Sequence, residues 1–232
     1  LAAVFAVTGM LGMALFAYGG VELTASGKQG GEKLPPVTSG GRTSVFWKIF
    51  AVFFLAAAAG LMVLSQAAGI VAAYGGSGKL AVFGTTGITA AIATARLTGG
   101  WLTDKFAVPT VMSGAQVLAL AGAIILTLWP SDYVAVATLA MVGIGYGLIS
   151  GATAGAIGLY WPKEQFGRVA GRTYIAWCIA AVSLPVLAAR LFDLTGGYAT
   201  AVIVAGAGNL LGALIAASLP RHPPASMAQP AA

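Results

Sequence analysis

Residues 133–162 read YVAVATLAMVGIGYGLISGATAGAIGLYWP, a stretch of thirty residues without one charged side chain. A helix needs about 20 apolar residues to cross the hydrocarbon core of a bilayer. Only 8% of the whole chain is charged, and its mean hydropathy is +0.91, whereas a soluble domain carries about 25% charged residues. This composition excludes a soluble enzyme, and it predicts an all-α, polytopic membrane protein.

Outward from this stretch, further apolar runs predict seven membrane helices in all. Gly, Pro and the Trp and Tyr residues typical of the membrane–water interface mark their ends. We expect them at residues 1–18, 46–73, 79–102, 107–129, 133–159, 169–191 and 198–219. An odd number of spans places the two ends of the chain on opposite sides of the membrane.

Two segments are not expected to span. Residues 19–45 are rich in Gly, Ser, Thr and Pro, and we interpret them as a flexible linker. Residues 220–232 form a Pro-rich tail that we expect to be disordered, which leaves 46–219 as a six-helix domain. Because Leu1 is not an initiator Met, we expect the chain to be the later part of a longer polypeptide. A signal sequence at 1–18 is the alternative, but the basic n-region and the cleavage site are missing.

The basic residues predict the orientation rather than a nucleic-acid partner. Net charge is +6, but the cations flank apolar helices, as the positive-inside rule describes. Lys79 and Arg190 fall on one side and Arg96 within a span. The other side carries Lys28, Lys33, Arg42, Lys48, Lys105, Lys163, Arg168, Arg172 and Arg221. That side is expected to be cytoplasmic, with the C-terminus there, in a cell's inner membrane.

No cofactor or metal is expected. Cys178 is the single cysteine, so the chain can form neither an internal disulfide nor a Cys-rich zinc site. The single histidine, His222, lies in the tail without neighbouring metal ligands.

One span carries glycine at every fourth position. The stripe consists of Gly143, Gly147, Gly151 and Gly155. Small residues at this spacing allow two membrane helices to pack closely. A smooth stripe also suits helices that slide during a conformational cycle, and the sequence leaves both interpretations open.

Arg96 is the one charge expected inside a span. An arginine at the centre of a bilayer costs at least about 2.5 kcal/mol, so it needs a partner, a wet cavity or a path to the interface. The predicted helix end lies six residues away, or ~9 Å at ~1.5 Å per residue, beyond the reach of the side chain. This distance favours a partner over snorkelling past Trp101.

The expected partner of Arg96 is a ligand or a residue outside this chain. All the carboxylates fall in loops or at helix ends: Glu22, Glu32, Asp104, Asp132, Glu164 and Asp193. A guanidinium binds a carboxylate through two parallel hydrogen bonds. We therefore predict that Arg96 binds a carboxylate substrate.

Several strings of sequence carry a family resemblance. The junction GGWLTDKFAVP (99–109) contains Gly-x-x-x-Asp-Lys between two membrane helices, and the family's pattern continues with Gly and a basic residue where this chain has Ala107 and Val108. Further strings are GLMVLSQAA (60–68), ARLTGGW (95–101), FGR (166–168), AW (176–177) and RLFDLTGGY (190–198). Together they resemble the major facilitator superfamily, in particular its oxalate/formate antiporter-like and monocarboxylate branch.

This resemblance implies helices six to twelve of a twelve-helix transporter. Residues 1–18 would then be the last helix of an N-terminal half missing from this chain, and 19–45 the cytoplasmic central loop. It also implies alternating access, with Arg96 as the substrate-carboxylate arginine. Gly100, Asp104 and Lys105, which match the loop motif, imply a cytoplasmic gate in which Asp104 pairs with Arg168 or Arg172 in one state and releases them in the other. A plain solvated charge is the other interpretation of Asp104.

The expected substrate is a small monocarboxylate. Oxalate-specific relatives place a lysine in helix eleven, whereas residues 174–178 read YIAWC here. Tyr174 and Trp177 are candidates for the cavity wall, although a tryptophan in mid-helix is as often packing. Gln66 and Tyr146 complete the candidate set. Such polar groups within spans, Gln116 and Asn209 included, more often make interhelical hydrogen bonds.

The expected function is therefore secondary transport, by antiport or proton-coupled symport. Two other classes of membrane protein are alternatives. A seven-helix receptor or retinal protein has the same span count, but residues 198–219 contain no lysine for a Schiff base. A membrane scaffold or assembly subunit that has lost transport is the second alternative, and Arg96 argues against it.

Overall fold

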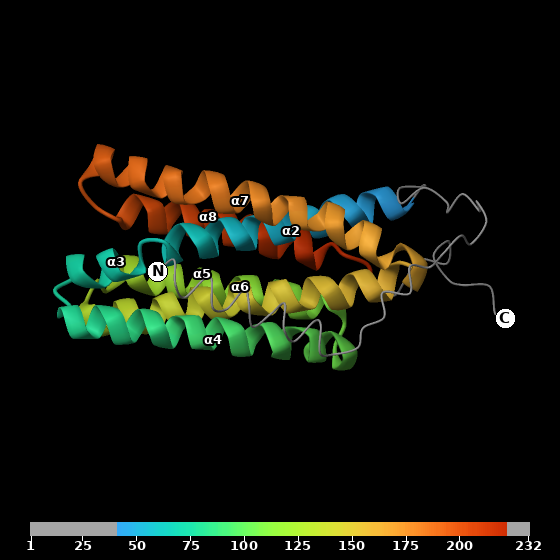
Figure 1. The fold of residues 1–232 in the computed structure, drawn as a ribbon, viewed down its shortest axis with the longest axis horizontal. Helices are drawn as coiled ribbons and strands as arrows, with labels where there is room; N and C mark the ends of the chain where they lie inside the picture. Colours follow the sequence, from blue (N-terminus) through green and yellow to red (C-terminus); the bar gives the residue numbers. More distant parts are fainter. Residues whose placement is uncertain (1–40, 222–232) are drawn as a thin grey trace, which may run out of the picture. The chain divides into compact units, whose positions relative to one another are not determined.

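The computed structural model describes residues 41–221, and every regular element in this range is helical (Figure 1). In chain order the elements are α2 (Gly41–Leu64), α3 (Ala67–Ala73), α4 (Gly78–Lys105), α5 (Val108–Leu128), α6 (Asp132–Tyr160), the 3-10 helix η1 (Lys163–Gln165), α7 (Phe166–Thr195) and α8 (Ala199–Ala217). The all-α class is confirmed. The expected helix at 1–18, nearly all of the expected linker, and the tail with His222 lie outside the described residues.

Within residues 41–221, six helical segments are long and apolar enough to cross a membrane. They correspond to six of the seven predicted spans, and their ends follow local capping signals. Ser77 accepts a hydrogen bond from the Leu80 backbone N–H (3.2 Å) at the start of α4, and Ser131 caps α6 in the same way. At the end of α7, Gly196 adopts the left-handed conformation (φ 69°) that stops a helix.

The prediction of one continuous helix over residues 46–73 is wrong. The helix is interrupted between Leu64, where α2 ends, and Ala67, where α3 begins. The Ser65 hydroxyl donates to the Met62 carbonyl (3.0 Å), and the Gln66 N–H bonds to Val63, only three residues back. A serine that bonds to nearby backbone competes with the regular helical pattern. Gln66 therefore lies at a helix break rather than within a span.

The glycine stripe of α6 packs directly against α4. A Cβ on Gly147 would lie 2.7 Å from the Ile92 carbonyl oxygen, and one on Gly151 would collide with the Arg96 carbonyl. No side chain larger than hydrogen fits at either place. The expectation of close packing is confirmed, and the contact holds the backbone of Arg96 against α6.

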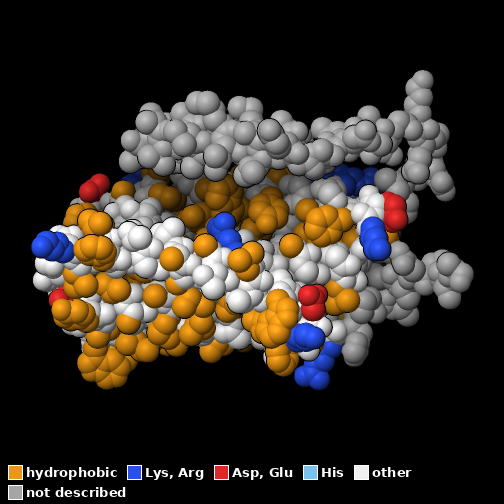
Figure 2. Space-filling model, turned by 60° about the horizontal axis from the view of Figure 1, so that its bottom comes forward, with side chains coloured by type: hydrophobic (Ala, Val, Ile, Leu, Met, Phe, Trp, Pro, Cys, Tyr) orange, Lys and Arg blue, Asp and Glu red, His pale blue; other side chains and the backbone are white. Residues whose placement is uncertain are grey.

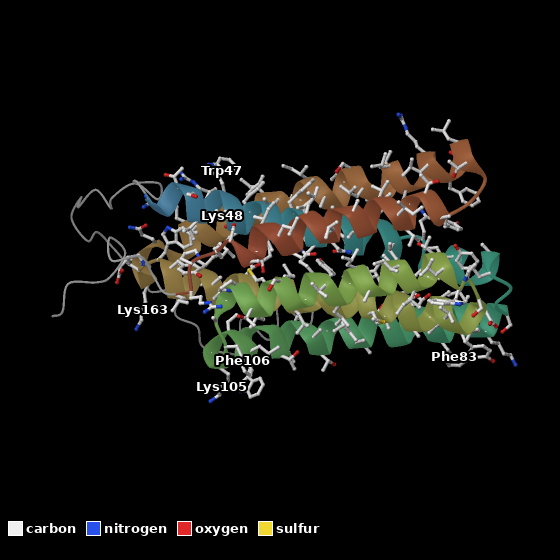
Figure 3. The ribbon with its side chains drawn as sticks, turned by 180° about the vertical axis from the view of Figure 1, so that it is seen from behind. Trp47, Lys48, Phe83, Lys105, Phe106 and Lys163 are labelled. Carbon is white, nitrogen blue, oxygen red and sulfur yellow. The ribbon has the colours of Figure 1, made fainter. Side chains whose placement is uncertain are left out.

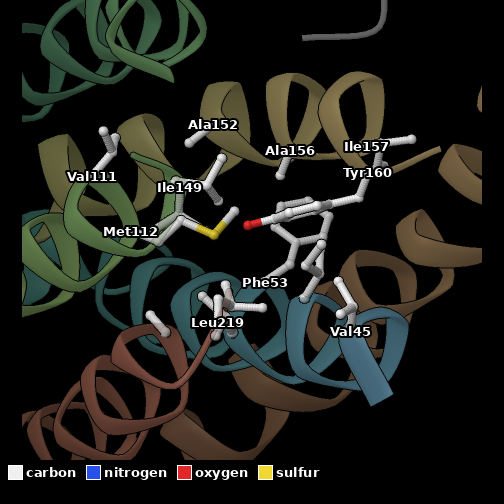
Figure 4. Close-up of a cluster of buried hydrophobic side chains, with 14 of the residues drawn as sticks. Val45, Phe53, Val111, Met112, Ile149, Ala152, Ala156, Ile157, Tyr160 and Leu219 are labelled. Atoms are coloured by element: carbon white, nitrogen blue, oxygen red, sulfur yellow. The ribbon is translucent and has the colours of Figure 1, made fainter. Parts of the chain in front are cut away.

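Large apolar side chains fill the space where α2, α5 and α6 meet (Figure 4). Phe53, Met112, Ile149 and Tyr160 are each at most 1% exposed. Fully burying such side chains contributes about 1.5–3 kcal/mol each in water. In a bilayer this driving force is absent, so close contact and dispersion stabilise the bundle instead.

Burial is uneven among the six spans. In the apolar stretches of α2, α5, α6 and α8, 44–56% of the residues are buried, against 28% in α4 and 17% in α7. On the face drawn in Figure 2, charged side chains gather toward the two ends, and one basic side chain lies near the middle. Helices α4 and α7 thus carry faces that the described residues leave uncovered.

Candidate functional site

Arg96 lies on α4 and contacts α6. Its Nη2 donates a hydrogen bond to the Tyr146 hydroxyl oxygen (2.9 Å), and its guanidinium carbon is 5.3 Å from the centre of the Tyr146 ring. Cation–π contacts of this kind contribute about 0.5–2 kcal/mol. The guanidinium therefore points to α6 rather than to the end of its own helix, which is not the conformation that snorkelling would give.

Tyr146 is held in place by its packing. Only 3% of the residue is exposed. Its ring lies against Gly60 on α2, where a Cβ would come within 2.7 Å of the ring carbon Cγ. Side-chain groups with little room to move are well suited to orient a ligand.

Trp177 of α7 completes a group of three polar side chains. Its indole Nε1 donates to the Tyr146 hydroxyl oxygen at 2.6 Å. Trp and Arg side chains are donors only, so this oxygen accepts both hydrogen bonds. Within the described residues, the Tyr146 proton is then left to donate to a ligand. We call Arg96, Tyr146 and Trp177 the anion triad, after the ligand that we propose for it.

The anion triad borders a cavity of about 590 Å³. The remaining lining residues are mainly apolar: Leu61, Leu64, Thr85, Thr89, Ile92, Ala93 and Leu97. Among these described residues Arg96 is the single cation, and a carboxylate is absent. Pockets of this composition bind small organic molecules, with the few polar groups fixing their orientation.

The other predicted substrate residues lie outside the lining of this cavity. Tyr174 is 40% exposed and packs edge-on against Phe53, with ring centres 5.2 Å apart. Gln66 is half-buried at the break between α2 and α3. Among the candidates, the structure thus brings Arg96, Tyr146 and Trp177 together, from three different helices.

Sequence reasoning missed three residues of the cavity region. Thr85 and Thr89 line it, and Gly60 provides the space for the Tyr146 ring. A signal for the threonines was present, because residues spaced by four and seven along a helix share a face, here with Arg96. The role of Gly60 depends on packing between distant segments and had no local signal.

The predicted gate residues lie at helix ends. Asp104 and Lys105 are exposed at the end of α4, and Arg168 and Arg172 are exposed in the first turns of α7. Gly100 lies opposite Gly151 of α6. Lys105 and Lys163 lie at the same end of the bundle as Lys48, whereas Phe83 lies at the opposite end (Figure 3). Pairing of Asp104 with an arginine stays a prediction.

Two further polar side chains, one on α5 and one on α8, are buried. Gln116 of α5 donates through Nε2 to the Val52 carbonyl of α2 (3.2 Å), which confirms the interhelical hydrogen bond expected of it. Asn209 of α8 is 1% exposed, and its amide nitrogen has no partner in the part of the chain that the structure describes. Neither residue lines the cavity of the anion triad.

The comparisons with known proteins agree with this architecture. A family model described as Major Facilitator Superfamily matches residues 49–232, which is most of the chain. The search of curated proteins gives no match. The family consists of membrane transporters that are generally not enzymes, and the six apolar helices fit a multi-pass membrane protein. The chain belongs to the major facilitator superfamily.

Proposed function

We propose that this chain is the C-terminal half of a secondary transporter that carries a small organic anion, most simply a monocarboxylate, by alternating access. The observation that carries the proposal is the anion triad: one arginine and two aromatic hydrogen-bonding groups at a mainly apolar cavity. A fixed cation beside an apolar wall suits a carboxylate with a hydrocarbon body.

The chemistry of the triad supports an anion over a neutral ligand. A guanidinium carries five N–H donors, of which Arg96 directs one to Tyr146. The remaining donors and the Tyr146 proton can converge on one carboxylate. Charge-assisted hydrogen bonds of this kind contribute about 1.5–3 kcal/mol each.

The charge count favours a monocarboxylate over a dicarboxylate. In α7 the segment 174–178 contains no cation, and among the described residues that line the cavity Arg96 is the single positive charge. A second carboxylate would lose its hydration without a partner, which is costly in an apolar site. Antiport with another anion and symport with a proton are both compatible with this site.

The surroundings of the site follow from the same proposal. The N-terminal half of the transporter would cover the open faces of α4 and α7, and the two halves would rock about the cavity. Asp104, Lys105, Arg168 and Arg172 would close the cytoplasmic side. The C-terminus would be cytoplasmic, and the membrane a cell's inner membrane.

The test is uptake of labelled propanoate by proteoliposomes that contain the complete transporter. Arg96→Gln is expected to lower uptake at least about tenfold, because it removes a charge-assisted contact. Arg190→Gln is the matched control, since Arg190 is an exposed cation of α7 that lines a different cavity. Equal uptake by the Arg96 variant would refute the assignment of this residue. Absence of monocarboxylate uptake by the unmodified transporter would refute the transport proposal and favour the non-transporting scaffold.

A further inference from the structure

A second polar group lies in the cavity of the anion triad, on the same helix as Arg96. Thr85 and Thr89 line this cavity together with Arg96. They precede Arg96 by eleven and seven residues, which are three turns and two turns of helix. The cavity is therefore polar at two places, with Ile92 and Ala93 between them.

Both threonine hydroxyls have their protons engaged already. Thr85 donates to the Ala81 carbonyl (2.7 Å) and Thr89 donates to the Thr85 carbonyl (2.9 Å). A hydroxyl has one proton and two lone pairs, so each oxygen still has the capacity to accept. The pair thus offers acceptors, whereas the anion triad offers donors.

The separation between the two polar places is that of a short chain molecule. Seven residues of helix rise ~10 Å between Thr89 and Arg96. Helical side chains lean toward the N-terminus, so the guanidinium lies closer to Thr89 than the two backbones do. Arg96 bonds to Tyr146. Gly147, the residue after Tyr146, packs on Ile92, which lies between Thr89 and Arg96 on α4. A ligand that reaches both places spans about 5–10 Å.

Charge decides which donor the ligand can bring to Thr85 and Thr89. The described lining residues include no carboxylate, so an ammonium group would find no counter-ion among them. A hydroxyl group carries no charge and donates one hydrogen bond, which a threonine oxygen accepts.

We propose that Thr85 and Thr89 form a second subsite, and that the substrate is a monocarboxylate with a hydroxyl group at its far end. This inference rests on the proposed function, because Arg96 must hold the carboxylate for the far end to reach the threonines. The two threonines then select among monocarboxylates, while the anion triad binds all of them.

The test compares two probes that differ in one hydroxyl, 6-hydroxyhexanoate and hexanoate, by calorimetric titration of the complete transporter. We expect the hydroxylated probe to bind about fivefold more tightly, the effect of one neutral hydrogen bond. Thr89→Val or Thr85→Val should reduce this ratio, and the double variant should bring it near one.

Thr86→Val is the matched control. Thr86 makes the same backbone bond, to the Val82 carbonyl (2.9 Å), but does not line the cavity. This variant should keep the fivefold preference. Equal binding of the two probes by the unmodified transporter, with hexanoate binding still lost in Arg96→Gln, would overturn the threonine subsite alone. Hexanoate binding that does not depend on Arg96 would overturn the proposed function and the subsite with it.

Discussion

Helices α4 and α5 both pack against α6, and each borders a hollow of very different character. The cavity beside α4, of about 590 Å³, contains the anion triad and two threonines. The groove between α5 and α8, of about 290 Å³, is lined by apolar side chains with Thr127 as the exception. A hollow is thus present on both sides, and the placement of a cation and its hydrogen-bonding partners is what distinguishes the α4 side.

The largest expected effect concerns the contact that supports the α4 side. Gly147→Val would force a side chain into the Ile92 carbonyl, so it should destabilise the fold by about 3 kcal/mol or more. Thermal unfolding of the purified protein checks this. Gly158→Val is the control on the same helix, because a Cβ there meets nothing within 4 Å. If the two variants melt alike, the close contact between α4 and α6 does not stabilise the protein.

The next effect separates binding from folding on the same side. Tyr146→Phe keeps the ring against Gly60 but removes the oxygen that accepts from Arg96 and Trp177. We expect about tenfold weaker hexanoate binding, since a donor to the ligand and the orientation of Arg96 are lost together. The melting temperature should change by only a few degrees. Hexanoate binding equal to that of the unmodified protein would show that the hydroxyl does not contact the ligand.

The smallest effect concerns the α5 side. Gln116→Leu removes one interhelical hydrogen bond and also a buried oxygen that has no partner in the described residues. These two changes oppose each other, so the stability should stay within about 1 kcal/mol of the original. Uptake of propanoate should be unchanged. A large loss of uptake would show that the α5 side takes part in transport, contrary to the comparison.

The sequence predicts the spans well because bilayer thickness sets the length of an apolar helix. It does not predict the break at Ser65 and Gln66, because two local hydrogen bonds decide it. One is donated by the Ser65 side chain and the other by the Gln66 backbone. A uniform apolar composition on both sides of the break conceals that local competition.

Of the anion triad, Arg96 is the residue that stands out in the sequence. A charge inside an apolar run is visible without any knowledge of the fold. Tyr146 and Trp177 become its neighbours only through the rotation of α6 and α7 about their axes. For α6, contacts between distant segments at Gly60 and Gly147 contribute to this rotation.

The most direct test of the central claim locates the anion itself. A structure of the complete transporter with 3-bromopropanoate, solved with the anomalous signal of bromine, would place a monocarboxylate in the bundle. We predict that its carboxylate lies within hydrogen-bond distance of Arg96 and the Tyr146 hydroxyl, with bromine in the cavity that Thr89 lines. A bound anion at Arg190, or one elsewhere with Arg96 still bonded to Tyr146 alone, would contradict the account.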